Sequence, residues 1–240
     1  MRTSFVEGYG GARLRVREAG PPDGPPILLV HGWSQSGLCW ERQLSGDLSN
    51  RFRLVAPDLR GHGDSDKPDD EAFYRDSAAW AGDIAAVIEQ CGLEDPVIVG
   101  WSMGGKVVGD YLDAHGETDI SATVLVGAPL YVTPEEAEAR SEAAKAHGTY
   151  SDDSAIAIPA VIAFLKACTH QPMVEADFAK ALAYNMLCPP FARKRSRQRV
   201  PDYRPVFRKL GKPVLFIYGA EEEIVSAATC KALIAEIPNC

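Results

Sequence analysis

A serine between two glycines stands at residues 100–104, which read Gly-Trp-Ser-Met-Gly. These residues follow a short apolar run at 96–99 and precede a helical pattern over 103–115. A serine held in such a tight strand-to-helix turn exposes its hydroxyl, and the two glycines avoid side chains that would collide there. The start of the helix also favours a developing oxyanion. The pattern therefore predicts that Ser102 is a nucleophile that attacks a carbonyl carbon.

The same stretch nearly matches a phosphate-binding loop, which would require a different chemistry. Residues 100–107 follow the G-x-x-x-x-G-K-[ST] pattern up to its last position, where Val107 has no hydroxyl to bind magnesium. Trp101 and Met103 are also bulky for a loop that wraps a phosphate with its backbone. We therefore favour the nucleophile, and we expect Lys106 to lie on the helix surface.

A second segment, His31-Gly32-Trp33, follows an apolar run at 26–30. Acyl transfer needs two backbone N–H groups that point at the oxyanion of the tetrahedral intermediate. One normally comes from the residue after the nucleophile, here Met103, and the other from the loop after such a strand, here Trp33. His31 is then expected to hold the loop in place and not to carry protons.

A third segment, residues 58–68, is rich in glycine and aspartate. Its glycines do not match the G-x-G-x-x-G pattern of a dinucleotide site, because Asp66 occupies the last position. We interpret the segment as a rigid loop of Asx-type turns, in which Asp58 and Arg60 are buried in local hydrogen bonds. His62 is expected to serve this loop and not catalysis.

The elements that must position these residues alternate between strands and helices, which is typical of a parallel sheet flanked by helices. Apolar runs predict strands at 3–7, 12–18, 26–30, 53–56, 96–99, 122–126 and 213–218. Helical patterns lie at 38–49, 72–91, 103–115 and 226–237. The predicted fold class is therefore α/β, with a mostly parallel sheet.

Between residues 129 and 208 this alternation stops, and helical patterns run over 135–147, 154–168 and 174–187. We interpret residues 131–205 as a helical cap or lid over Ser102, inserted between the core segments 1–130 and 206–240. The helices of this cap are strongly apolar, which favours an apolar substrate group.

The cap also contains a basic run, because five of the seven residues at 193–199 are arginine or lysine. Such a run is compatible with a localisation signal or an anion-binding patch. We favour a third interpretation, a solvated face of a cap helix that balances an acidic protein.

Segments 31–33, 58–68 and 100–104 together resemble the α/β-hydrolase fold family, in the group of cofactor-free haloperoxidases and small serine carboxylesterases. The resemblance covers nearly the whole chain. It implies attack by a serine on an ester, a histidine base and a carboxylate that orients the histidine, with no metal or organic cofactor. Dehalogenases and epoxide hydrolases of this fold use an aspartate nucleophile, so Ser102 disfavours those activities.

The resemblance also implies a position for the acid. In the family's segment after the strand at 213–218, the acid stands three residues after a glycine, which selects Glu222 after Gly219. The neighbouring Glu221 and Glu223 leave this register open by one residue.

The histidine is the difficulty, because triads of this fold run in the order serine, acid, histidine. None of the 18 residues after Glu222 is a histidine. One more helix, strand and loop would place the base roughly 25–30 residues after the acid. We therefore expect a chain that lacks the last strand, the base and the final helix.

The predicted function is a serine hydrolase of carboxylic esters whose base is absent from this chain. The alternative is a base-less hydrolase fold that binds a small molecule or a partner without catalysis.

Charge and hydropathy narrow the partners. The 240-residue chain carries a formal net charge of −8, which argues against nucleic acid and anionic membranes. No apolar stretch reaches the roughly 18 residues of a membrane span, and residues 1–8 show no apolar core of a secretory signal. We expect a cytoplasmic protein with a small, ester-like, apolar substrate. The sequence gives no prediction of whether the protein is a monomer or an oligomer.

Overall fold

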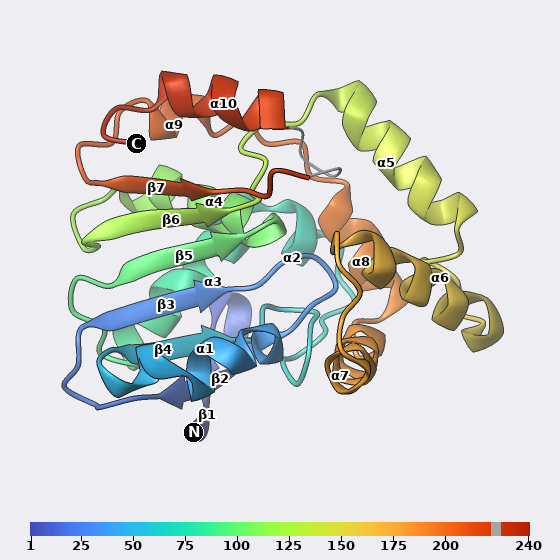
Figure 1. Cartoon of the computed structure of the whole chain (residues 1–240), viewed down its shortest axis with the longest axis horizontal. Helices are drawn as coiled ribbons and strands as arrows, with labels where there is room; N and C mark the ends of the chain where they lie inside the picture. The colour runs from blue at the N-terminus through green and yellow to red at the C-terminus, as the bar shows by residue number, and fades with distance from the viewer. Residues whose placement is uncertain (222–226) are drawn as a thin grey trace.

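The computed structural model describes residues 1–221 and 227–240, which form a seven-stranded sheet of order β1-β2-β4-β3-β5-β6-β7 (Figure 1). β1 pairs antiparallel with β2, and β2 with β4, whereas β3 to β7 run parallel. The predicted fold class, α/β with a mostly parallel sheet, is confirmed. The strands are β1 (Arg2–Glu7), β2 (Arg13–Ala19), β3 (Pro26–Val30), β4 (Arg53–Pro57), β5 (Val97–Trp101), β6 (Ala122–Val126) and β7 (Val214–Ile217).

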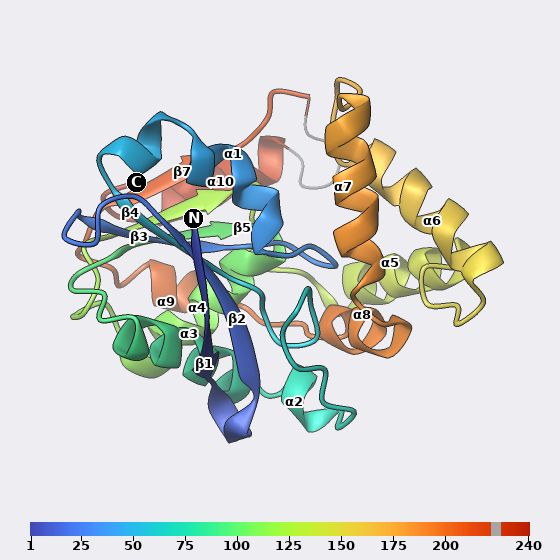
Figure 2. The same ribbon diagram turned by 90° about the horizontal axis from the view of Figure 1, so that it is seen from below.

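Helices cover both faces of the sheet, because its central strands carry apolar side chains on both sides (Figure 2). On one face, α3 (Ser77–Gln90) and α4 (Met103–His115) share a core with Leu28, Ile98 and Leu125. On the other face, the 3₁₀ helix η2 (Gly37–Trp40) and α1 (Glu41–Ser45) pack through Trp40 and Leu44 on Leu29, Leu54 and Val99.

Two of the predicted helices are broken in the structure. The helix expected over 38–49 is divided into η2, α1 and the 3₁₀ helix η3 (Asp47–Asn50), because Gly46 has an extended backbone. The helix expected over 72–91 is divided into α2 (Ala72–Arg75) and α3. Asp76 separates them, since its extended backbone ends one helix and its carboxylate caps the next by accepting a hydrogen bond from Ala78 N at 2.9 Å.

Helices fill the chain between β6 and β7, and residues 127–213, all of them described, add no strand to the sheet. The first four of these helices lie beyond the carboxyl ends of β3 and β5, whereas the last and shortest one lies against α4 on a face of the sheet (Figure 1). Pro134 and the capping box of Thr133 and Glu136 begin the first of them. They are α5 (Pro134–Ala146), α6 (Ser154–Ala167), α7 (Glu175–Met186), α8 (Pro190–Arg197) and the short α9 (Arg204–Phe207).

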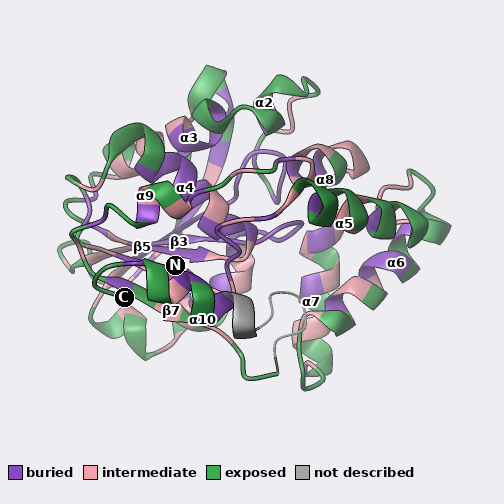
Figure 3. Ribbon diagram, turned by 90° about the horizontal axis from the view of Figure 1, so that it is seen from above, coloured by how far each residue is buried: buried purple, intermediate pink, exposed green. Residues whose placement is uncertain are grey.

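The described part of the chain ends with β7 and α10 (Ala227–Glu236), which packs on the same core as α4 through Leu233. Figure 3 shows that the central strands are buried, whereas α5 is largely exposed. β7 has one bare face, on which Leu215 and Ile217 are 54% and 47% exposed.

Candidate active site

Ser102 occupies a strained turn between β5 and α4. Its backbone lies at φ 53° and ψ −117°, in the left-handed region that residues with a side chain rarely adopt. The amide of Ser102 donates a hydrogen bond to the carbonyl of Val126 at 2.9 Å, which ties the turn to the neighbouring strand β6. Strain held in place by surrounding structure is common at functional sites, so the turn supports the interpretation of Ser102 as a nucleophile.

The glycines around Ser102 allow α4 to pack directly on the backbone of β3. A Cβ atom on Gly104 would lie 2.4 Å from the carbonyl oxygen of Val30, and one on Gly105 would lie 2.4 Å from the Cβ of Ala128. Both distances are shorter than any real carbon contact allows. The close approach at Gly104 and Gly105 positions the helix N-terminus beside the loop after β3.

The loop after β3 carries Trp33, one of the two predicted oxyanion donors. The indole of Trp33 donates a hydrogen bond to the carbonyl of Arg193 at 2.9 Å and packs edge-on against Phe164 at 5.0 Å between ring centroids. Within residues 1–221 and 227–240, the amides of Trp33 and Met103 donate no hydrogen bond. Both residues line one cavity with Ser102. The two amides are therefore available, which the predicted role requires.

His31 and His62 lie side by side beneath this loop, with ring centroids 5.1 Å apart. In His31, Nδ1 bonds the carbonyl of Gly32 at 2.8 Å and Nε2 accepts the amide of Leu59 at 2.9 Å. In His62, Nδ1 bonds the carbonyl of Arg60 at 2.8 Å and Nε2 accepts the amide of Ser34 at 3.2 Å. All four ring nitrogens are thus engaged with the backbone, which is the framework role expected of both histidines.

Burial keeps both imidazoles neutral. It lowers the pKa of His31 to about 4 and that of His62 to about 3, with a smaller contribution to His62 from the charge of His31. A ring that is neutral and donates from Nδ1 leaves Nε2 as an acceptor, which matches the two amides bonded there. Neither ring has a free nitrogen to take a proton from Ser102.

Asp58 and Arg60, two charged residues at the start of the loop at 58–68, have partners outside the loop. Asp58 accepts the amides of Gly37 at 2.7 Å and Asp64 at 2.8 Å, and pairs with Arg17 of β2 at 2.6 Å. Arg60 forms a two-pronged pair with Asp83 of α3, with both contacts at 2.6 Å. Both side chains are buried, as expected, and the hydrogen bond from the amide of Asp64 is local. The expectation of local hydrogen bonds is incomplete, because the charged partners, Arg17 and Asp83, lie far away in the sequence.

Two cavities meet at Ser102. The larger, of about 230 Å³, lies under α6 and is lined by Ser102, Trp101 and Phe164. The smaller, of about 70 Å³, is bounded by α4, α5 and the end of α8 and is lined by Ser102, Trp33 and Met103. Arg197 lines both cavities. A substrate bound across Ser102 would therefore contact the sheet edge and the helices inserted between β6 and β7.

Two expectations about basic residues are wrong. Lys106 is half-buried and lines the smaller cavity, because it lies one helical turn after Ser102 and points the same way. The run at 193–199 is not a solvated face: Arg193 and Arg199 are buried and Arg197 is half-buried, whereas Lys194 is exposed. These positions were missed because nothing in the local pattern shows which side of α8 faces the core.

Arg193 joins the inserted helices to the loop that carries Trp33. Its guanidinium donates to Ser34 Oγ at 3.1 Å, to the carbonyl of Thr149 at 3.1 Å and to the carbonyl of Asn185 at 2.7 Å. Burial lowers its pKa. This side chain positions the loop without touching the cavity at Ser102.

The acid predicted at Glu222 lies outside the described residues, so its position stays a prediction. Its neighbour Glu221 is exposed and lines a separate hollow with His170. The five histidines of the chain all lie within the described residues, and none of them lines either cavity at Ser102.

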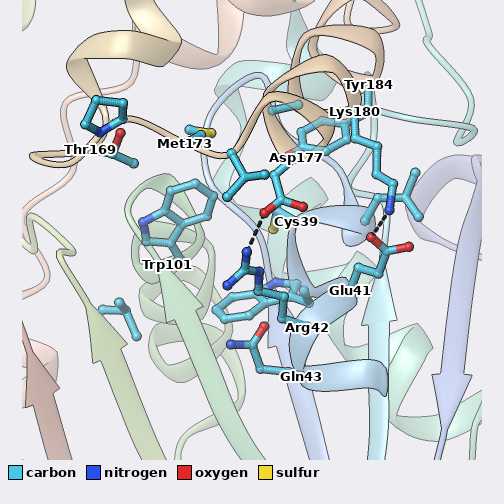
Figure 4. Close-up of a pocket in the computed structure, with 16 residues that line it drawn as sticks. Cys39, Glu41, Arg42, Gln43, Trp101, Thr169, Met173, Asp177, Lys180 and Tyr184 are labelled. Carbon is cyan, nitrogen blue, oxygen red and sulfur yellow. Dashed lines mark hydrogen bonds and ion pairs between the residues drawn. The ribbon is translucent and has the colours of Figure 1, made fainter. Parts of the chain in front are cut away.

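A further hollow, with a volume of about 580 Å³, lies between α1 and α7 (Figure 4). Two ion pairs cross it, between Arg42 and Asp177 and between Lys180 and Glu41. The hollow reaches Trp101 but not Ser102, so we interpret it as the seam where α7 meets the core. In residues 1–221 and 227–240, no group of His, Cys, Asp and Glu could hold a metal ion. No described helix is long and apolar enough to cross a membrane.

The chain belongs to the alpha/beta hydrolase fold family, whose sequence model matches residues 25–240. This is the family expected from the tight turn at residues 100–104, the loop after β3 and the segment at 58–68.

Several curated relatives share 30% or more of the aligned residues. The chain is 37% identical over 133 residues to a non-heme haloperoxidase of Rhodococcus erythropolis, an alignment that covers 55% of this chain and 47% of the relative. It is 30% identical over 234 residues to a 2-(acetamidomethylene)succinate hydrolase of Mesorhizobium japonicum, covering 91% of this chain and 78% of the relative. The alignments to the haloperoxidases and to an esterase/perhydrolase thus span less than half of those proteins.

Among solved structures, the fold resembles that of the esterase RhEst1 from a Rhodococcus species. The TM-score is 0.89 at 35% sequence identity, and the superposition covers 100% of this chain and 88% of the esterase.

Proposed function

We propose that this protein is a serine hydrolase of the carboxylesterase type, in which Ser102 attacks the carbonyl carbon of a small ester. The position of Ser102 is the observation that carries the proposal. Its backbone is held at a positive φ at the start of α4, and its side chain lines the same cavity as Trp33 and Met103. Relatives named as an esterase/perhydrolase and as haloperoxidases support the same class.

In the proposed reaction, the oxygen of Ser102 bonds to the ester carbon while a base takes the hydroxyl proton. The amides of Trp33 and Met103 donate hydrogen bonds to the resulting oxyanion. The proton then passes to the alcohol as it leaves, and water releases the acyl group by the same steps. Glu222 is proposed to orient the base and to stabilise its charged form.

The base is proposed to be a histidine outside the 240 residues. His31 and His62 have no free ring nitrogen, and His115, His147 and His170 line neither cavity at Ser102. Without a base the hydroxyl of Ser102 stays protonated and attacks slowly, so the chain alone is expected to be a poor catalyst.

The helices inserted between β6 and β7 are proposed to act as a cap that shapes the substrate site. The larger cavity at Ser102 is lined by Trp101, Phe164 and Ala167, which suits an apolar part of the substrate. A small ester with one apolar group is the substrate class that fits this cavity.

A missing base can be supplied from solution, which gives a direct test. Imidazole added to the 240-residue chain should raise its turnover of 4-nitrophenyl butyrate in a saturable way, by roughly a hundredfold. The rate of the Ser102→Ala variant measures the reaction of imidazole alone and is subtracted. Ser45→Ala, a serine on α1, is the control and should keep the response.

Two outcomes would contradict parts of the proposal. Fast turnover without imidazole that Ser102→Ala abolishes would show that a residue of this chain is the base. Equal rates for the parent and Ser102→Ala at every imidazole concentration would favour the alternative, a hydrolase fold that binds without catalysis.

A further inference from the structure

The smaller cavity at Ser102 is surrounded by basic side chains from separate elements. Lys106 comes from α4, Arg140 from α5, Arg197 from the end of α8, and Arg199 from the segment after it. Lys106, Arg140 and the pair at 197 and 199 lie far apart in the sequence and converge only in the fold. An ester substrate requires no such charge, so the cluster is unexplained by the proposed reaction.

Most of this positive charge has no carboxylate partner within the described residues. Arg199 pairs with the buried Asp110, whose carboxylate also accepts the hydroxyl of Tyr203. Among residues 1–221 and 227–240, no carboxylate lies within 4 Å of the basic groups of Lys106, Arg140 and Arg197. Four cations therefore face one described anion, that of Asp110.

The cluster is electrostatically unfavourable as it stands. Burial, together with the neighbouring guanidinium groups of Arg140, Arg199 and Arg197, lowers the pKa of Lys106 to about 8, against a smaller opposing effect of Asp110. Burial also lowers the pKa of Arg197. Cations out of water repel one another and cost folding free energy unless an anion compensates them.

The shape of the site favours a small anion beside the nucleophile. The guanidinium of Arg197 is fixed over the indole of Trp33, 4.2 Å from the ring centroid, which holds it at the cavity wall. The cavity of about 70 Å³ has room for a group of a few atoms, and Ser102 joins it to the larger cavity.

We propose that the substrate carries a carboxylate, which Lys106, Arg140 and Arg197 bind in the smaller cavity while the ester lies at Ser102. This inference rests on the proposed function, because it assigns a substrate class to the same site. Arginine and lysine bind carboxylates through charge-assisted hydrogen bonds, which are stronger than neutral ones. The apolar part of the ester then occupies the larger cavity.

Binding without turnover tests the carboxylate site separately from catalysis. The Ser102→Ala chain, which cannot hydrolyse an ester through Ser102, is titrated calorimetrically with monoethyl succinate and with ethyl succinamate. The two probes have nearly the same shape and differ in a carboxylate against an amide. Monoethyl succinate should bind roughly tenfold to a hundredfold more tightly.

Substitutions in the basic cluster test whether these side chains cause the tighter binding of monoethyl succinate. Lys106→Met and Arg197→Met, each in the Ser102→Ala background, should reduce the preference for monoethyl succinate to about twofold or less. Lys194→Met removes an exposed charge from the same helix as Arg197 and should keep the full preference. Thermal unfolding identifies a variant that fails to fold, and Lys106→Met keeps the test valid if Arg197→Met is lost through its contact with Trp33.

Equal affinity for the two probes overturns the inference, as does a preference that survives both variants. A third result would also overturn it: Lys106→Met slowing the imidazole-dependent hydrolysis of ethyl butyrate and monoethyl succinate by the same factor would show that the charge acts on the oxyanion. The two binding results do not depend on whether the chain is an efficient esterase, so a failed imidazole test leaves them intact. Only the third result requires imidazole-dependent turnover.

Discussion

Lowering the pH from 7 to 5 is expected to remove about 2 kcal/mol of unfolding free energy through each of His31 and His62. Burial lowers the pKa of His31 to about 4 and that of His62 to about 3 in the folded protein. In the unfolded chain both groups titrate near 6.5. At a pH between the folded and the unfolded pKa, the histidine is protonated in the unfolded state but neutral in the folded state. The free energy of unfolding therefore falls as the pH falls.

The difference between the folded and unfolded pKa values sets the pH range over which each histidine loses its contribution to stability. The contribution of each neutral histidine is fully present above about pH 6.5 and declines by about 1.4 kcal/mol for each pH unit below it. The decline ends for His31 near pH 4 and for His62 near pH 3. Because the rings are 5.1 Å apart, protonation of one opposes protonation of the other, and the two contributions are coupled.

Urea unfolding at pH 7, 6 and 5, followed by tryptophan fluorescence, measures the effect. The His31→Gln variant loses some stability at every pH, but its stability should fall less steeply between pH 7 and 5, by about 2 kcal/mol over that interval. His147→Gln, an exposed histidine at the end of α5, is the control for removing a histidine as such. A His31→Gln variant whose stability falls as steeply as that of the parent would refute the reasoning.

Other substitutions compare the stability contributions of a buried and an exposed ion pair, and test the tight turn around Ser102. Asp83→Asn leaves Arg60 buried and poorly compensated, and should cost about 3–5 kcal/mol in urea unfolding; a loss below 1 kcal/mol would contradict the buried pair. Arg42→Gln breaks an ion pair whose arginine side chain is 77% exposed, and should change stability by less than about 1 kcal/mol at any salt concentration. Gly104→Ala places a Cβ 2.4 Å from a carbonyl of β3 and should lower the melting temperature and the imidazole-dependent turnover together; an unchanged melting temperature would be unexpected.

The sequence predicted three features: the tight turn around Ser102, the loop after β3, and the alternation of strands and helices. Each depends on neighbours within a few residues: the glycines around Ser102, the apolar run before His31, or the period of a strand. Helix ends were less predictable, since Asp76 interrupts an otherwise continuous helical pattern by capping α3.

The surroundings of the charged residues were decided only by the tertiary structure. Arg60 meets Asp83 and Arg17 meets Asp58 across 23 and 41 residues of sequence, so no local pattern could pair them. Lys106 was expected on the helix surface once the phosphate-binding loop was rejected, and only the packing of α5 and α8 over α4 encloses it. Burial is a property of what covers a side chain, and here the covering elements lie dozens of residues further along the chain.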